Sequence, residues 1–183
     1  YVYFGDYLMG KSHDLATMAS DGFAFSGAVT HSGTVTHSGI VTNTAQPAFL
    51  AVGASDQNNL AINNTHDVAF GTEIFDQGNN FASSIFTAPV TGRYQLNAKV
   101  LLISVDTDNT FVNFYLVTSN RTYGYTINSV GYDTDGYVSA VINQLVDMDA
   151  SDTAKVQVQI PSGGAAQTDI SAANSYFSGY LVG

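Results

Sequence analysis

The feature that most constrains the fold is a series of short strand patterns that begins near Pro47 and continues to the C-terminus. Between Arg93 and Leu102, and again between Lys155 and Ile160, apolar and polar residues alternate. This period of two is typical of a strand with one buried face and one wet face. Turn-forming residues separate the patterns, and many short strands spaced in this way predict an all-β sandwich or barrel. Further strands are predicted at residues 48–52, 68–70, 84–87, 111–118, 123–128, 138–146 and 176–182.

The composition limits the partners that this chain can take. Charged residues make up only 11% of the 183 residues, and the formal net charge is −10, whereas ordinary globular proteins contain roughly 25% charged residues. Nucleic acid and anionic membranes are disfavoured because both need clustered cations. The absence of cysteine excludes disulfides and thiol chemistry. A surface this poor in charge is either covered by partner chains or rich in Asn, Ser, Thr and Tyr.

Residues 1–24 form an N-terminal segment with aromatic residues near its start, among them Tyr1, Tyr3 and Phe4. A segment of this length cannot bury a core of its own. It is either a partly ordered tail or an anchor that orders when it docks on another protein. The aromatic residues favour the anchor. No apolar run in the chain approaches the roughly 18 residues of a membrane span.

Residues 25–46 contain a repeat followed by a hinge. The pattern x-Ser-Gly-x-Val-Thr occurs three times between residues 25 and 42, and residues 43–46 connect it to Pro47. One valine in six residues cannot stabilise a single chain, but three chains wound together would bring Val29, Val35 and Val41 onto a shared axis. We therefore predict a short trimeric β stalk. The alternative is a flexible linker, since glycine and serine are abundant.

Two histidines occupy the same position in successive repeats, His31 and His37. In a threefold stalk each would form a ring of three imidazoles, which could hold a metal or an anion. Valine is the more natural residue for the axis, so the interpretation that these histidines point outward is favoured.

Five segments of the strand-rich region occur in a fixed order: Pro47–Ala51, Ile74–Phe81, Ser84–Tyr94, Leu145–Val156 and Tyr176–Val182. The third contains the spacing Phe-x-x-Pro-x-x-Gly-x-Tyr, and the fifth contains Phe-Ser-Gly-Tyr-Leu. Together they resemble the complement-type globular head, the tumour necrosis factor-like jelly roll, over residues 47–183. The resemblance implies a compact homotrimer with a stalk before the head and a partner-binding surface on it.

The same resemblance implies that aromatic residues line the core or the trimer axis. The candidates are Phe86, Tyr94, Phe114, Phe177 and Tyr180. A strand at 111–118 has apolar residues on both sides, and this pattern favours a subunit interface over open water.

Three Asp-x-Asp pairs are candidate calcium ligands, since Ca²⁺ takes carboxylate and carbonyl oxygens. Asp133 and Asp135, followed by Gly136, form the strongest pair. The other two are Asp106 with Asp108 and Asp147 with Asp149. The interpretation that all three pairs are solvated turn residues is favoured, and apart from calcium no cofactor is expected.

Catalysis finds little support in the sequence. Glu73 is the only glutamate, and neither a Gly-x-Ser-x-Gly elbow nor a phosphate-binding loop is found. An enzyme that acts on surface polysaccharide is the weakest of the functions considered. We expect a structural or binding protein and not an enzyme.

The order of anchor, repeat and head favours a homotrimeric projection of a virion, as a bacteriophage fibre, spike or capsid decoration protein. Its N-terminus would attach to other virion proteins, and its head would lie on the virion surface and contact a glycan or protein of the host. The alternative is a secreted, complement-like recognition or adhesion module of a cellular organism.

Overall fold

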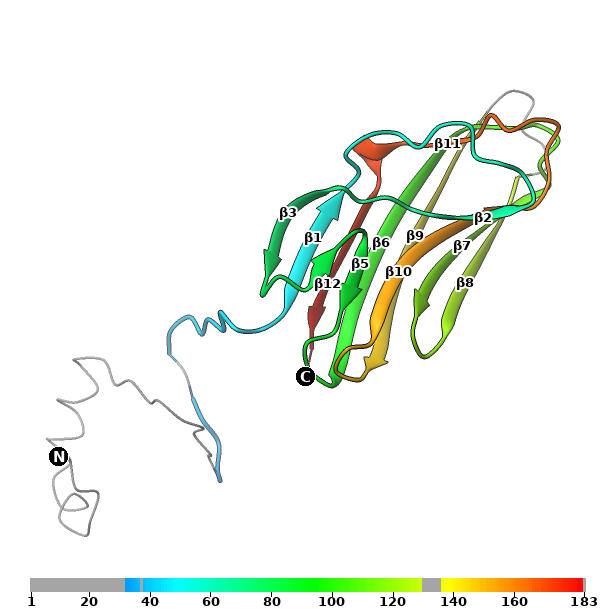
Figure 1. Ribbon diagram of the computed structural model, residues 1–183. Coiled ribbons are helices and arrows are strands. Elements are labelled where there is room, and N and C mark those ends of the chain that lie inside the picture. Colours follow the sequence, from blue (N-terminus) through cyan, green and yellow to red (C-terminus); the bar gives the residue numbers. More distant parts are fainter. Residues whose placement is uncertain (1–31, 37, 130–135, 183) are drawn as a thin grey trace, which may run out of the picture. The chain divides into compact units, whose positions relative to one another are not determined.

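The computed structural model of the chain describes residues 32–36, 38–129 and 136–182. Contacts group the chain into two units, residues 1–42 and 43–183. In the second unit, two antiparallel sheets of six strands each face one another as a sandwich (Figure 1). The elements are β1 (Ala48–Val52), β2 (Asn64–Asp67), β3 (Thr72–Gln77), β4 (Phe81–Ala82), β5 (Ile85–Thr87), β6 (Gly92–Val105), β7 (Phe111–Thr118), β8 (Thr122–Asn128), β9 (Gly136–Met148), β10 (Thr153–Ile160), β11 (Asp169–Ile170), the 3₁₀ turn η1 (Ala172–Asn174) and β12 (Tyr176–Leu181).

Sheet A contains, across its width, β9, β6, β12, β1 and β3, and β11 also pairs with β6. Sheet B contains β4, β5, β10, β7 and β8, and β2 also pairs with β10. The chain crosses between the sheets repeatedly, for example from β6 to β7, from β8 to β9 and from β9 to β10. The last strand, β12, lies beside the first, β1. This connectivity is a jelly roll, so the predicted all-β jelly-roll sandwich is confirmed.

Most predicted strands lie where the alternation of apolar residues places them. β1 and β7 have the predicted bounds, and β5, β6, β8, β9, β10 and β12 differ by one to three residues at an end. The strand predicted at 68–70 is wrong. Val68 and Phe70 are buried, and Val68 N–H still donates to the carbonyl of Val156 on β10 at 3.0 Å. However, β2 ends at Asp67, and the chain then leaves sheet B for sheet A. β3 escapes prediction because its residues are exposed or half-buried on both sides.

The core lies between the sheets and is centred on aromatic rings. Phe49 of β1 stacks on Phe86 with ring centroids 4.8 Å apart, and Phe177 of β12 meets Phe49 edge-on at 5.0 Å. Gly179 of β12 faces the same cluster, where an added Cβ would lie 2.4 Å from Leu96 and 2.8 Å from Phe49. The Ser-Gly step in the closing strand therefore allows β12 to pack closely between β1 and β6.

Residues 32–36 and 38–42 form no strand in the described part of the repeat. The chain bends at Ser32-Gly33 and again at Ser38-Gly39, so the local structure repeats with the sequence. Val35 is 43% exposed and Val41 is 65% exposed, and Val29 lies outside the described residues. A single chain does not bury these valines, so the trimeric β stalk stays a prediction.

Candidate functional site: the outer faces of the two sheets

The aromatic residues singled out in the sequence divide into two groups. Phe86, Tyr94, Phe114 and Phe177 are each 0% exposed. They lie between the sheets and belong to the core of one chain, where they cannot reach a neighbouring subunit. Tyr180 is 48% exposed, because it points away from the core on the opposite side of β12 from Phe177 and Gly179. Of the five, Tyr180 is therefore the one positioned to contact a partner.

The outer face of sheet A, which points away from the core, carries large apolar side chains. Leu145 of β9 and Tyr180 of β12 are both cross-strand partners of Gln95 on β6, and each is 48% exposed. Val141, further along β9, is 52% exposed. We call this surface the sheet A outer face; its apolar members are Leu50, Val52, Phe75, Leu101, Tyr137, Val141, Leu145, Tyr176 and Tyr180, and its polar members include Gln95, Asn97, Lys99, Asn143 and Ser178.

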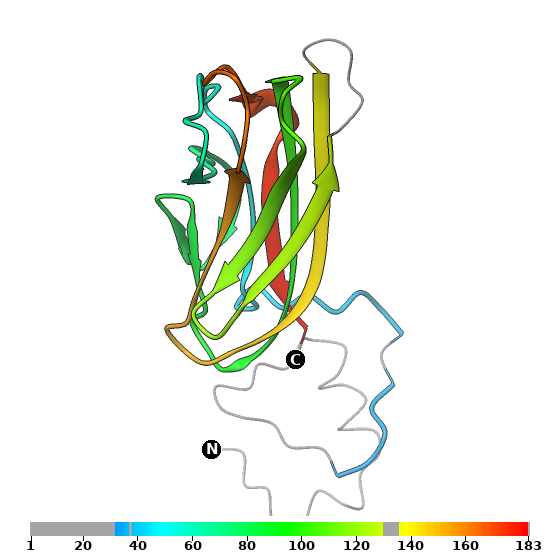
Figure 2. The same ribbon diagram turned by 90° about the vertical axis from the view of Figure 1, so that its right-hand side faces the viewer.

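One side of the sandwich ends in two strands that each have a single neighbour. In the described part of the chain, β9 pairs with β6 alone and β8 pairs with β7 alone. β9 is 13 residues long, and Figure 2 views the molecule from this side. Tyr125 of β8 lies beside this edge and is 39% exposed. A long strand edge of this kind is usually covered, because its unpaired backbone groups otherwise invite non-specific pairing.

The outer face of sheet B is polar by comparison. Two rows of cross-strand partners run over β8, β7, β10 and β2. We call this surface the sheet B platform; one row contains Thr126, Asn113, Gln159 and Thr65, and the other contains Gly124, Tyr115, Gln157 and Asp67. The strand at 111–118, expected at a subunit interface, therefore presents amide and phenol groups at the centre of its outer side. Its inward residues, among them Val112, Phe114 and Leu116, belong to the core.

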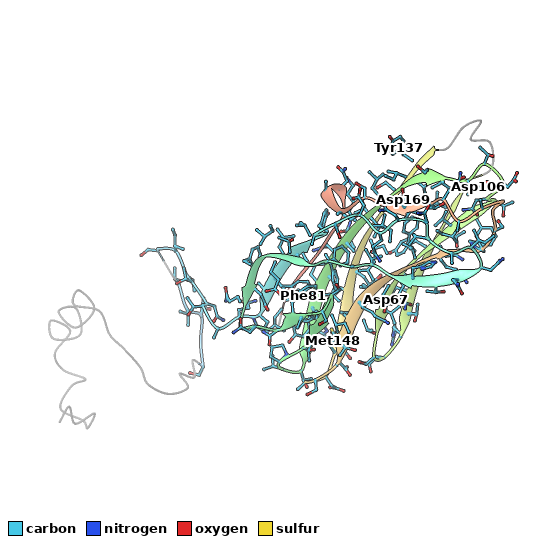
Figure 3. All side chains as sticks on the ribbon, turned by 45° about the horizontal axis from the view of Figure 1, so that its top comes forward. Asp67, Phe81, Asp106, Tyr137, Met148 and Asp169 are labelled. Atoms are coloured by element: carbon cyan, nitrogen blue, oxygen red, sulfur yellow. The ribbon has the colours of Figure 1, made fainter. Side chains whose placement is uncertain are left out.

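Asp106 connects two loops at the end of the head that lies away from the C-terminus (Figure 3). Its carboxylate accepts hydrogen bonds from the backbone N–H of Asp108 at 2.8 Å and from those of Gly164 and Ala165 at 2.9 Å each. The side chain is 8% exposed. These N–H groups, the one of Asp108 foremost, hold the pKa of Asp106 below its usual value, although burial opposes them. Asp106 therefore stabilises the contact between the loop after β6 and the loop after β10.

The other carboxylates do not assemble into a metal site in the described residues, where no three His, Asp or Glu side chains gather. Asp149 accepts a weak hydrogen bond from Thr91 Oγ1 at 3.4 Å, and Asp147 lies on β9 as the cross-strand partner of Arg93. The favoured calcium ligands, Asp133 and Asp135, lie outside the described residues, as do His31 and His37.

The hinge residues expected at 43–46 are fixed against the head. Gln77 Nε2 donates to the carbonyl of Asn43 at 3.1 Å and to that of Gln46 at 2.6 Å. Gln46 Nε2 in turn donates to the carbonyl of Leu181, near the C-terminus. The chain therefore enters the head beside the end of its last strand, and the loop held by Asp106 lies at the opposite end (Figures 1 and 3).

Comparison with known proteins identifies the family. Residues 48–182 match the model of the C1q domain, and the chain belongs to this family. The globular domain of zebrafish complement 1qA has a similar structure, with a TM-score of 0.55, 13% identity, and coverage of 75% of this chain and 98% of that one. Murine APRIL at pH 8.0 gives a TM-score of 0.54, 14% identity, and coverage of 75% and 99%. No curated protein matches the chain.

Membership of this family confirms the resemblance to the complement-type head and the tumour necrosis factor-like fold. Domains of this kind are binding or structural modules without enzymatic activity, often trimeric and typically extracellular. The expectation that the chain is not an enzyme is therefore confirmed. Within the described ranges, no helix is long and apolar enough to cross a bilayer.

Proposed function

We propose that the chain is the subunit of a homotrimeric projection, in which the sheet A outer face is buried between subunits and the remaining surface of the head is displayed for binding. One observation carries the proposal. Val141 and Leu145 on β9 and Tyr180 on β12 flank β6 on the same outer face, and roughly half of each residue is exposed. Contiguous apolar patches on soluble chains mark interaction surfaces.

The open edge beside β8 and β9 is the complementary surface. Tyr125 of β8 supplies exposed aromatic area there, and aromatic residues are enriched at protein interfaces. If the sheet A outer face of one subunit packs on the open edge of the next, the contact is heterologous. Such contacts form a closed ring when the rotation that relates neighbouring subunits divides evenly into a full turn. Three subunits are the number common in this family, so the proposed ring is a trimer.

The repeat before the head supports the same assembly. Val35 and Val41 are exposed in the single chain, and three chains would bury them together with Val29 on a common axis. Residues 25–46 are then the stalk and hinge, and residues 1–24 are the anchor. Within the head, the end that carries Asp106 lies opposite the point where residues 43–46 join it. Asp133 and Asp135 stay a proposed calcium site, and an unchanged melting temperature between chelator and millimolar Ca²⁺ would exclude it.

Two biological settings suit this architecture. The order of anchor, repeat and head supports a virion projection that attaches to a host surface. The match to the C1q domain equally supports a secreted recognition or adhesion module of a cellular organism. Sedimentation of source material distinguishes the two, because a virion component travels with particles and a secreted module remains in the soluble fraction.

Light scattering on the full chain tests the assembly itself. We expect a mass three times that of one chain, and a trimer that persists on dilution to low micromolar concentration. A monomeric mass at all concentrations would contradict the proposed function, because the sheet A outer face would then remain open to solvent.

A further inference from the structure

We propose that the sheet B platform is a binding site for neutral carbohydrate. In the proposed trimer, the sheet A outer face is buried and the platform on the other sheet points outward, so this inference rests on the proposed function and names the class of ligand that the head would bind. The platform spans four strands, a width of about 14 Å from β8 to β2 at the usual strand spacing.

Hydrogen bonds within the platform hold its polar side chains in fixed positions. Thr126 Oγ1 donates to Asn113 Oδ1 at 2.7 Å, and Asn113 Nδ2 donates to Gln159 Oε1 at 2.9 Å. On the second row, Gln157 Nε2 donates to Asp67 Oδ1 at 2.6 Å. Side chains ordered before binding lose less conformational entropy when a ligand arrives, so the network favours a ligand made of hydrogen-bonding groups.

The two glutamines retain one hydrogen-bonding end each. The amide oxygen of Gln159 accepts from Asn113 and Tyr115, whereas its NH₂ group has no partner among the described residues. Gln157 is the reverse, since its NH₂ group donates to Asp67 and its oxygen is free of described partners. The two residues lie two apart on β10 and share a face. They offer a donor beside an acceptor, which matches neighbouring hydroxyl groups of a sugar, each able to accept and to donate.

Tyr115 supplies an aromatic ring in the middle of this polar surface. Its hydroxyl donates to Gln159 Oε1 at 3.0 Å, two residues beyond its cross-strand partner Gln157, so the ring leans along the sheet. One edge of the ring lies over Gly124, where an added Cβ would be 3.2 Å from Cε1 and 3.3 Å from Cδ1. The glycine leaves room for this position, and the half-buried ring presents apolar area to the carbon–hydrogen face of a sugar.

The near absence of charge on the platform favours a neutral ligand. Its one carboxylate, Asp67, forms an ion pair with Lys155 at 2.9 Å on the rim, and its other members are uncharged. Polyanions need clustered cations, which are absent here. A protein partner is less well matched, because the centres of protein interfaces are rich in large apolar and aromatic residues. The platform holds one aromatic residue, Tyr115, and Phe111 lies beyond its end on the same side of β7.

Binding can be tested by passing the full chain over immobilised mannan, galactan and dextran, with heparin as the anionic comparison. We expect retention on at least one neutral polysaccharide, elution by its free monosaccharide, and no elution by salt. Three platforms per trimer would strengthen a weak single contact through multivalency. Retention on none of the three neutral polysaccharides, or on heparin alone, would overturn the proposal.

Variants then locate the site. Gln157→Ala and Gln159→Ala remove the free amide ends without touching the core, and each is expected to weaken monosaccharide binding about two- to tenfold, the loss of one hydrogen bond. Tyr115→Ser removes the ring, and Tyr115→Phe restores it without the hydroxyl. Asn58→Ala, an exposed amide outside the platform, is the matched control and should bind normally. Equal binding by the platform variants and the control would also overturn the proposal.

The outcome separates this inference from the proposed function. Light scattering on the same samples measures the mass of the assembly. Changes in the nuclear magnetic resonance shifts of the Gln157 and Gln159 side-chain amides on addition of monosaccharide measure binding by each subunit. A trimer without these shifts contradicts the carbohydrate site alone. A monomer that shows them contradicts the assembly and leaves the site in place.

Discussion

The two outer faces of the sandwich have the same backbone geometry and different surfaces. Outward positions on sheet A include Val141, Leu145 and Tyr180, whereas the outward positions at the centre of sheet B include Asn113 and Gln157. The central strands of both sheets, β6 in sheet A and β7 and β10 in sheet B, bury their inward residues. The comparison shows that the core accounts for only one side of each strand. The residues on the other side depend on what contacts that face. We propose that a second subunit contacts sheet A and that solvent or a sugar contacts sheet B.

The largest difference between the two faces is expected when the same negative charge is placed on each of them. Leu145→Asp on sheet A, opposite Gln95, buries an unpaired carboxylate in the proposed interface, which costs about 3–5 kcal/mol, and we expect the trimer to dissociate into monomers. Val117→Asp on sheet B places its carboxylate opposite Lys155, and the trimer should persist. Light scattering measures both. Equal masses for the two variants would show that the faces do not differ in this way.

A pair of glycines tests the two sheets at the level of packing. Gly179→Ala introduces a Cβ 2.4 Å from a Leu96 methyl and 2.8 Å from the Phe49 ring, and overpacking of this kind lowers the free energy of unfolding by about 1–3 kcal/mol. Gly124→Ala meets the edge of an outer Tyr115 ring at 3.2 Å, and that ring can shift. Denaturant unfolding should therefore show a smaller loss for Gly124→Ala, and a loss as large as that for Gly179→Ala would contradict this account.

Acid should loosen the contact that Asp106 makes between the loop after β6 and the loop after β10. Its pKa is lowered in the folded chain by backbone N–H groups, that of Asp108 first. Because the carboxylate is stabilised in the folded chain, its full contribution to stability is present above the pKa of an aspartate in the unfolded chain, about 3.9. The contribution is lost as the pH falls through the lower pKa of Asp106 in the folded chain. Urea unfolding between pH 6 and pH 2, in roughly unit steps, should show this loss. In the variant Asp106→Asn, stability should fall less steeply with decreasing pH than in the wild type, and an equally steep fall would contradict this account.

The smallest effect is expected at the rim of the platform. Lys155 Nζ contacts both oxygens of Asp67, at 2.9 and 3.0 Å, but Asp67 is 60% exposed. Although partial burial raises it, hydrogen bonds from Gln157 and Lys155 leave the pKa of Asp67 below its usual value. We expect Lys155→Met to cost less than about 1 kcal/mol, to raise the pKa of Asp67, and to matter less in high salt. A loss unaffected by salt would indicate that packing of the lysine stem, rather than charge, is responsible.

Much of the fold could be read from the alternation of residues. β6 and β10 show clear alternation because one side of each strand is buried and the other is wet, and a period of two survives any detail of packing. The Phe-Ser-Gly-Tyr-Leu strand was identifiable because Gly179 and Phe177 occupy fixed places in the core. The strand predicted at 68–70 was wrong because Val68 and Phe70 have the spacing of a strand. They are buried in a connection between the two sheets.

The candidate site was less predictable. The strand at 111–118 suggested an interface because Phe111, Tyr115 and Val117 were counted as apolar on its outer side. In the structure, the hydroxyl of Tyr115 bonds to Gln159, a residue 44 positions away, and the same surface becomes a polar platform. Conversely, Val141 and Leu145 looked like ordinary members of a buried strand, although they face outward.

By itself, the sequence determined the all-β class, the position of the head, the motifs of the C1q domain and the absence of thiol chemistry, because period, composition and motif are local properties. The tertiary structure decided which side of each strand faces the core, which aromatic residues remain outside it, and that Tyr115, Gln157 and Gln159 share one surface. These depend on register between strands that are distant in the chain, where a shift of one residue would exchange the two faces.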